Sequence, residues 1–122
     1  MISNGLRIST ILALLAIPAA SNAAPAAKPP QFATCAVCHK INKGEKPGIG
    51  PNLFGVGGTK AGELPGFDFS PAMKKSGLVW NRANLIKFIT APQKTVPGTK
   101  MAYAGAKPDV AGALADYLLS LK

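Results

Sequence analysis

The chain has 122 residues, with 14 Lys and Arg, five Asp and Glu and a single His, which gives a formal net charge of +9 at pH 7. This length suits one domain rather than two. Because the chain contains only two cysteines and one histidine, it cannot supply the four Cys or His ligands of a structural zinc site.

The N-terminal segment has the layout of a secretory signal peptide. Arg7 supplies a positive charge, residues 8–17 are mostly apolar, and small residues occur at Ser21 and Ala23. The apolar run is shorter than the about 20 residues that span a bilayer. We therefore expect cleavage after Ala23, so that residues 1–23 are the signal peptide and residues 24–122 form one exported domain. An uncleaved membrane anchor is the alternative.

Both cysteines lie in residues 35–39, whose sequence CAVCH is the C-x-x-C-H pattern of covalent haem attachment. A helix over residues 31–40 would place Cys35, Cys38 and His39 on one face. The two thiols could then bond one haem c while the imidazole reaches the iron. A disulfide between cysteines this close would close almost no loop. A thioredoxin-like thiol pair would follow a strand, and no strand is predicted here.

The sixth position of such an iron needs a second donor, and the exported chain offers Met73 and Met101. Met101 lies in the Gly-containing loop 97–105, where a backbone can approach a flat ring closely. Met73 falls in a short helix expected between Ser70 and Gly77, where packing is its expected role. We predict Met101 as the ligand, with Met73 as the alternative. Thioether ligation raises the reduction potential.

Two other residues are candidates for contacts around the haem. The turn at Gly50 and Pro51 could present the Pro51 carbonyl to the second ring nitrogen of His39, as metal-bound imidazoles require. The indole N–H of Trp80 needs an acceptor if it is buried, and a haem propionate could accept it. Ordinary core packing explains Trp80 equally well.

The remaining segments predict an all-α domain, because no alternating strand pattern of useful length occurs. Asn81 is a natural cap for a helix that ends before Pro92. Pro108 opens the last helix, whose apolar stripe needs a partner, and Phe32 is the expected one. The stripe consists of Val110, Leu114, Tyr117, Leu118 and Leu121.

From Phe32 to its end the chain resembles the class I cytochromes c, of the mitochondrial cytochrome c and bacterial cytochrome c2 type. The motifs that carry the resemblance occur in register: CAVCH at 35–39, GPNL at 50–53, PGF at 65–67, GLVW at 77–80 and PGTKM at 97–101. The resemblance implies the class I cytochrome c fold, with short helices and long loops around one covalent haem c. It also implies a soluble one-electron carrier rather than an enzyme.

The resemblance further implies individual roles. His39 and Met101 would be the axial metal ligands, with the Pro51 carbonyl as the partner of the His39 ring. Trp80 and Thr99 would be neighbours of the haem propionates, and Tyr103 the aromatic residue beside the exposed haem edge. The chain also departs from the family at Thr59 (usually Arg), Phe69 and Phe88 (usually Tyr) and Met73 (usually Asn). Each change removes a hydrogen-bond donor near the haem, so the family's usual potential should not transfer directly.

Removal of Arg7 with the signal leaves 13 basic and five acidic residues, a net charge of +8. Nucleic acid is not the expected partner, because the chain is exported and lacks interleaved basic and aromatic residues. We expect a periplasmic monomer that docks on acidic donor and acceptor proteins of a respiratory or photosynthetic chain. The candidate docking lysines are Lys40, Lys46, Lys94, Lys100 and Lys107. The alternatives are a tethered or fixed subunit of a respiratory complex and a haem peroxidase.

Overall fold

The structure is a computed structural model that describes residues 5, 11–17 and 26–122. Residues 11–17 have no regular secondary structure, and their large apolar side chains are exposed. The expected cleavage position after Ala23 lies outside the described residues. Across the part that is described, no helix is both long enough and apolar enough to cross a membrane.

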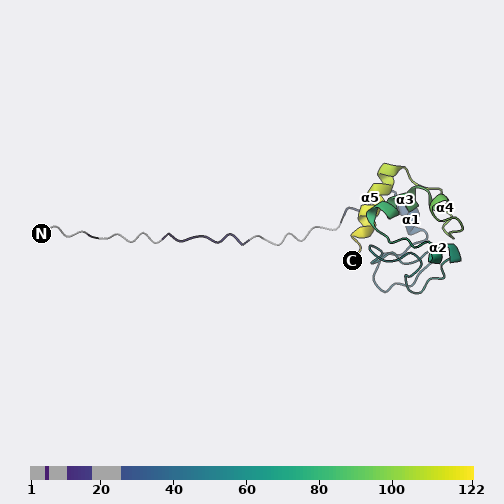
Figure 1. The fold of residues 1–122 in the computed structure, drawn as a ribbon, viewed down its shortest axis with the longest axis horizontal. Helices are drawn as coiled ribbons and strands as arrows, with labels where there is room; N and C mark the ends of the chain where they lie inside the picture. Colours follow the sequence, from purple (N-terminus) through teal and green to yellow (C-terminus); the bar gives the residue numbers. More distant parts are fainter. Residues whose placement is uncertain (1–4, 6–10, 18–25) are drawn as a thin grey trace.

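Five helices occur among residues 26–122: α1 (Phe32–Ala36), α2 (Pro71–Lys75), α3 (Arg82–Thr90), α4 (Pro92–Thr95) and α5 (Pro108–Leu119). Pairing of extended backbone in the same range is limited to one antiparallel bridge between Lys60 and Val79. In Figure 1, α1, α3 and α5 gather in the upper part of the domain, whereas α2 lies lower, among long loops. The expected all-α class is confirmed.

The start and the end of α3 follow from local chemistry. The Asn81 side chain accepts a hydrogen bond from the Asn84 backbone N–H at 2.8 Å, which satisfies a donor that the first helical turn leaves free. Ala91 leaves the helical conformation, with φ −148° and ψ 78°, because proline disfavours a helical residue before it. A new short helix, α4, begins at once with Pro92. The sequence predicted the Asn81 cap and the end of α3 before Pro92, but it did not predict α4.

The last helix packs against α1, as the sequence suggested, and also against α3. The rings of Phe32 and Tyr117 meet edge to face, with centroids 5.1 Å apart, so Phe32 is confirmed as a partner of the stripe. Leu114, Tyr117 and Leu118 of the predicted stripe are buried, and Val110 and Leu121 are partly buried against the same core. Ala111 and Ala115 are completely buried, whereas Leu121 lies beyond the end of α5. Small residues at this contact let the neighbouring segments approach closely.

Candidate cofactor site

A cavity of about 420 Å³ opens into the core, within the size range of cofactor pockets. Its walls come from α1, α2, α3, α5 and the loops around residues 49–53 and 99–103. All eight residues that the sequence analysis selected line it: Cys35, Cys38, His39, Pro51, Trp80, Thr99, Met101 and Tyr103. The fold therefore brings together residues that are up to 68 positions apart in the chain.

The two thiols are presented by the end of α1 and the turn after it. The prediction of a helix through residue 40 is wrong, because α1 ends at Ala36. The chain nevertheless continues as a tight turn, in which the N–H groups of Cys38 and His39 both donate to the Cys35 carbonyl, at 3.0 and 2.9 Å. This turn brings both cysteines and the histidine to the cavity without a longer helix.

The chemistry of the thiols differs from that of a thiol–disulfide enzyme. Both cysteines are free and half-buried. Burial raises the pKa of the Cys35 thiol, and the neighbouring Cys38 raises it further, although a backbone hydrogen bond opposes both. Redox-active cysteines have lowered pKa values, because the thiolate is the reactive form. Burial therefore shifts the pKa of Cys35 in the direction opposite to that of an activated thioredoxin-like cysteine.

The His39 ring is oriented by one hydrogen bond and one close backbone approach. Nδ1 lies 2.8 Å from the Pro51 carbonyl oxygen. A carbonyl can only accept, so Nδ1 carries the proton and Nε2 keeps its lone pair for a metal. Burial lowers the pKa of His39, while the hydrogen bond to Pro51 opposes this shift, and the neutral imidazole is the form that binds metals.

Gly50 is a site residue that the sequence analysis did not single out. A Cβ atom at this position would lie 2.6 Å from Cε1 and 2.8 Å from Nδ1 of the His39 ring. The Gly50 N–H donates to the Cys38 carbonyl at 2.8 Å, so its backbone is held against the turn that carries the histidine. The Gly-Pro pair was a visible signal, but only the packed structure shows how close the ring lies.

Both methionines of the described domain line the cavity. Met73 lies inside α2, which Ser70 caps as expected, and the residue is buried in the hydrophobic core. Met101 is half-buried on a loop without regular secondary structure. Met73 was predicted to lie in a short helix, with ligation of the iron as the less favoured alternative, and the structure places it both in α2 and on the cavity wall. Its presence there makes a direct test of the two sulfurs necessary.

The remaining wall residues give the cavity its polarity. Trp80 and Thr99 are buried, and the Thr99 hydroxyl accepts a hydrogen bond from the Met101 N–H at 3.3 Å. Burial raises the pKa of Tyr103, which keeps its phenol neutral.

Of the four departures from the family pattern, Phe69, Met73 and Phe88 line the cavity. The fourth, Thr59, donates its hydroxyl to the Val56 carbonyl at 2.7 Å.

These residues fit a haem c in their chemistry. Two thiols, an imidazole with an available nitrogen and a thioether line one largely apolar cavity, which suits a flat apolar ring with a metal at its centre. The Gly50 backbone lies so close to the His39 ring that no side chain would fit between them. The fold and the site together define a haem protein of the c type.

Comparison with known proteins identifies the family. A family model described as Cytochrome c matches residues 30–122, and the chain belongs to this family. It is 55% identical over 74 residues to a cytochrome c2 of Rhodoblastus acidophilus, a match that covers 61% of this chain and 69% of that protein. It is 48% identical over 95 residues to the cytochrome c2 iso-2 of Magnetospirillum fulvum, covering 76% and 97% respectively.

A solved structure supports the same assignment. Cytochrome cH from Methylobacterium extorquens is 47% identical and superposes with a TM-score of 0.67, covering 71% of this chain and 88% of that one. The class I cytochrome c fold is therefore confirmed. Proteins of the cytochrome c family bind haem c and carry electrons, so this chain is an electron-transfer protein and not a peroxidase or another enzyme.

Proposed function

We propose that the protein is a periplasmic one-electron carrier whose haem c is attached through Cys35 and Cys38 and ligated by His39 and Met101. The observation that carries this proposal is the His39–Pro51 hydrogen bond of 2.8 Å, which leaves Nε2 available in the cavity that both thiols and Met101 also line. We further propose residues 24–122 as the mature domain. The alternative is a tethered or fixed subunit of a respiratory complex.

The bound haem supplies one redox couple, ferric to ferrous iron. The protein's own contribution is positional. The Pro51 carbonyl fixes the tautomer and the orientation of the His39 ring and increases the donor strength of its other nitrogen. The buried core residues on the cavity wall exclude water, which is one of the means by which a protein sets a haem potential. His39 and Met101 would supply both axial donors to the iron. An electron carrier needs no open coordination position for a substrate.

We propose that Trp80 and Thr99 face the haem propionates and that Tyr103 lies beside the haem edge. Thr99 is one of only two buried polar side chains in the described core, and it lies with Trp80 on a largely apolar wall, which supports the first assignment. The neutral Tyr103 phenol at the cavity wall is compatible with the second assignment.

The direct test is spectroscopic. We expect the purified protein to be coloured, to keep its haem in acidified organic solvent and to titrate as a single one-electron couple. The double variant Cys35→Ala/Cys38→Ala should lose the haem during extraction, because covalent attachment requires at least one of the two thiols. A colourless protein, or haem that the solvent extracts from the unaltered chain, would refute the assignment. A soluble periplasmic form that begins at Ala24 would distinguish the free carrier from the anchored alternative.

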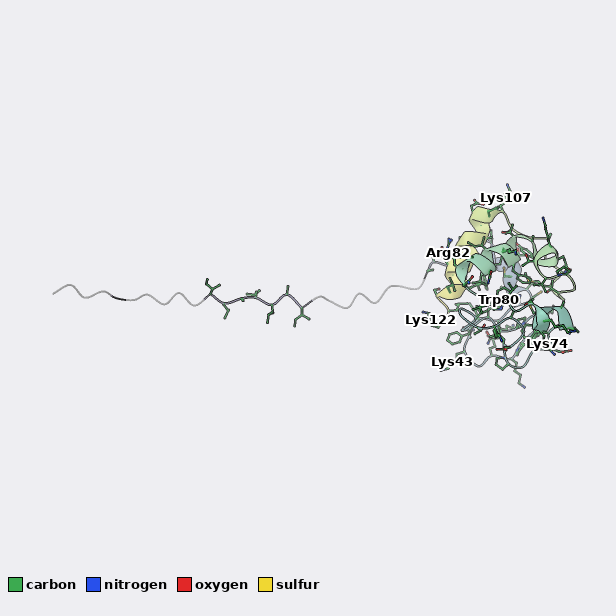
Figure 2. All side chains as sticks on the ribbon, in the orientation of Figure 1. Lys43, Lys74, Trp80, Arg82, Lys107 and Lys122 are labelled. Carbon is green, nitrogen blue, oxygen red and sulfur yellow. The ribbon has the colours of Figure 1, made fainter. Side chains whose placement is uncertain are left out.

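We propose acidic redox proteins as the partners of a monomeric carrier. Figure 2 shows Lys43, Lys74, Lys107 and Lys122 around the rim of the domain, so positive charge surrounds it in this view. Of the five candidate docking lysines, Lys100 lines the cavity. Its charge is partly balanced, because Nζ lies 3.3 Å from an Asp68 carboxylate oxygen. The net positive charge of the whole domain is therefore a stronger argument than any single lysine for electrostatic steering toward an acidic partner.

The rate of association with an acidic electron-transfer protein should fall at least about tenfold between 0.01 and 0.15 M ionic strength, because the Debye length shortens from roughly 30 to 8 Å. Stopped-flow oxidation of the reduced protein measures this rate. An uncharged small oxidant is the matched control and should react at a rate nearly independent of salt. Equal salt dependence for both oxidants would contradict electrostatic steering.

A further inference from the structure

We propose that Gln93 is a positioning residue for Met101, and that its side-chain amide holds the loop that carries this methionine in its closed arrangement. The inference rests on the proposed ligation by Met101. One nitrogen, Nε2 of Gln93, donates to two backbone carbonyls of the loop, that of Thr99 at 3.1 Å and that of Met101 at 3.0 Å.

The orientation of the amide follows from these two partners. An amide NH₂ group carries two hydrogens, one for each carbonyl, whereas the amide oxygen can only accept. With the amide reversed, its oxygen would face two carbonyl oxygens, which is repulsive. Among neutral side chains only Gln and Asn donate two hydrogens from one nitrogen, so the residue type at position 93 matters as well as its size.

Gln93 lies in α4, a short helix that is held in place by its own contacts. The preceding residue, Pro92, is among the most completely buried side chains of the domain. The hydroxyl of Thr95, at the other end of α4, donates to the Lys87 carbonyl of α3 at 3.0 Å. The Val96 N–H donates back to the Pro92 carbonyl at 2.9 Å. Because α4 follows α3 almost directly and is bonded back to it through Thr95, the Gln93 side chain transmits the position of α3 to the loop.

The contacts fix the three peptide groups around Met101. Gln93 holds the carbonyl of the Thr99–Lys100 peptide and the carbonyl of the peptide that follows Met101. The Thr99 hydroxyl accepts from the Met101 N–H at 3.3 Å and so fixes the peptide between them. With these three groups held, the direction of the Met101 side chain is set. Gln93 supplies two of the three constraints.

Loss of the amide should loosen the loop and leave the core intact. Gln93 itself is exposed, and its partners belong to the loop rather than to the packed helices. A hydrogen bond in such a place contributes modestly to stability, because water competes for the same groups. The expected effect is therefore on how often Met101 leaves the iron, with little effect on global unfolding.

The test uses the haem-loaded protein and the variants Gln93→Leu and Gln93→Glu. Leucine has a similar helix propensity and no donor, and glutamate keeps the length but places oxygens against the two carbonyls. We expect imidazole to bind the ferric form about three- to tenfold faster in Gln93→Leu, and faster still in Gln93→Glu, because imidazole must wait for Met101 to leave. The thermal midpoint of Gln93→Leu should stay within a few degrees of the unaltered protein.

The matched control is Gln31→Leu, the other glutamine of the chain, which is exposed and makes no side-chain cap hydrogen bond. Its imidazole binding rate should not change. Unchanged rates in both Gln93 variants would overturn the inference. The ligand assignment itself would be overturned by a different result. That result is an unaltered ferric protein without the weak red-edge absorption band of methionine-ligated haem. The two failures are therefore distinguishable.

Discussion

Replacing Met101 with Leu is expected to abolish the red-edge absorption band of the ferric protein and to lower its reduction potential. Thioether sulfur favours the softer ferrous iron, so its loss stabilises the ferric state. Axial ligands set haem potentials over about 0.8 V, and we expect a decrease on the order of 0.1 V or more from this single change. The band is measured by absorption spectroscopy and the potential by redox titration.

Met73→Leu is the matched control for this experiment, because Met73 also lines the cavity. Exchange of Met for Leu nearly conserves volume and costs less than about 1.5 kcal/mol in a packed core. The band should persist in Met73→Leu, with a potential close to that of the unaltered protein. If the band disappears in Met73→Leu and persists in Met101→Leu, the ligand is Met73, and the proposed role of the Met101 loop is wrong.

Replacing Gly105 with Ala should strongly destabilise the domain. Gly105 has φ +111°, a backbone conformation that residues with a side chain rarely adopt. A Cβ atom there would also clash with the backbone carbonyl oxygen of Thr90, the last residue of α3. The adjacent Ala106 N–H donates to the Ile89 carbonyl at 3.0 Å, so the loop cannot move away without losing this bond.

The strain and the clash each cost about 1–3 kcal/mol, so the free energy of unfolding should fall by about 3 kcal/mol. For a domain of this size the thermal midpoint should drop by about 10–20 °C. Gly44→Ala is the control, because Gly44 has φ +76° but no atom within 4 Å of a Cβ. It tests the backbone strain alone and should cost less. Equal losses in the two variants, measured by thermal denaturation, would show that the contact with Thr90 contributes nothing.

The functional importance of Gly105 follows from its position in the chain. It lies between Met101 and the start of α5, close to Thr90, and the hydrogen bond from the next residue, Ala106, to Ile89 holds the far end of the Met101 loop on α3. Gln93 holds the near end of the same loop from α4. The loop is therefore fixed on both sides of Met101 by neighbouring segments of the α3–α4 region.

Several parts of the site follow from short-range patterns. The CAVCH segment links two thiols and an imidazole by covalent spacing, and the structure keeps them together even though α1 ends earlier than predicted. The Asn81 and Ser70 caps are likewise confirmed, because capping depends on atoms only three residues apart. The Pro51 carbonyl was also predicted as the partner of His39, on the strength of a rigid turn, and the hydrogen bond is present.

Other parts could not be predicted in this way. The distance from Gly50 to the His39 ring depends on how two loops pack. The complete burial of Ala111 and Ala115 beside the predicted α5 stripe was not expected, because the neighbouring segments decide where small residues are needed. The two hydrogen bonds from Gln93 to the Met101 loop require α4, a helix that the sequence pattern did not predict.

The amino-acid sequence by itself determined the chemistry of this protein: the thiols, the imidazole, the candidate thioethers and the positive charge. It did so because residue types and their covalent spacing are local properties. Only the tertiary structure decided which groups share one cavity, how closely a glycine approaches the imidazole and what holds the Met101 loop. Those relations join residues far apart in the chain, and their distances are set by the packing of the whole domain.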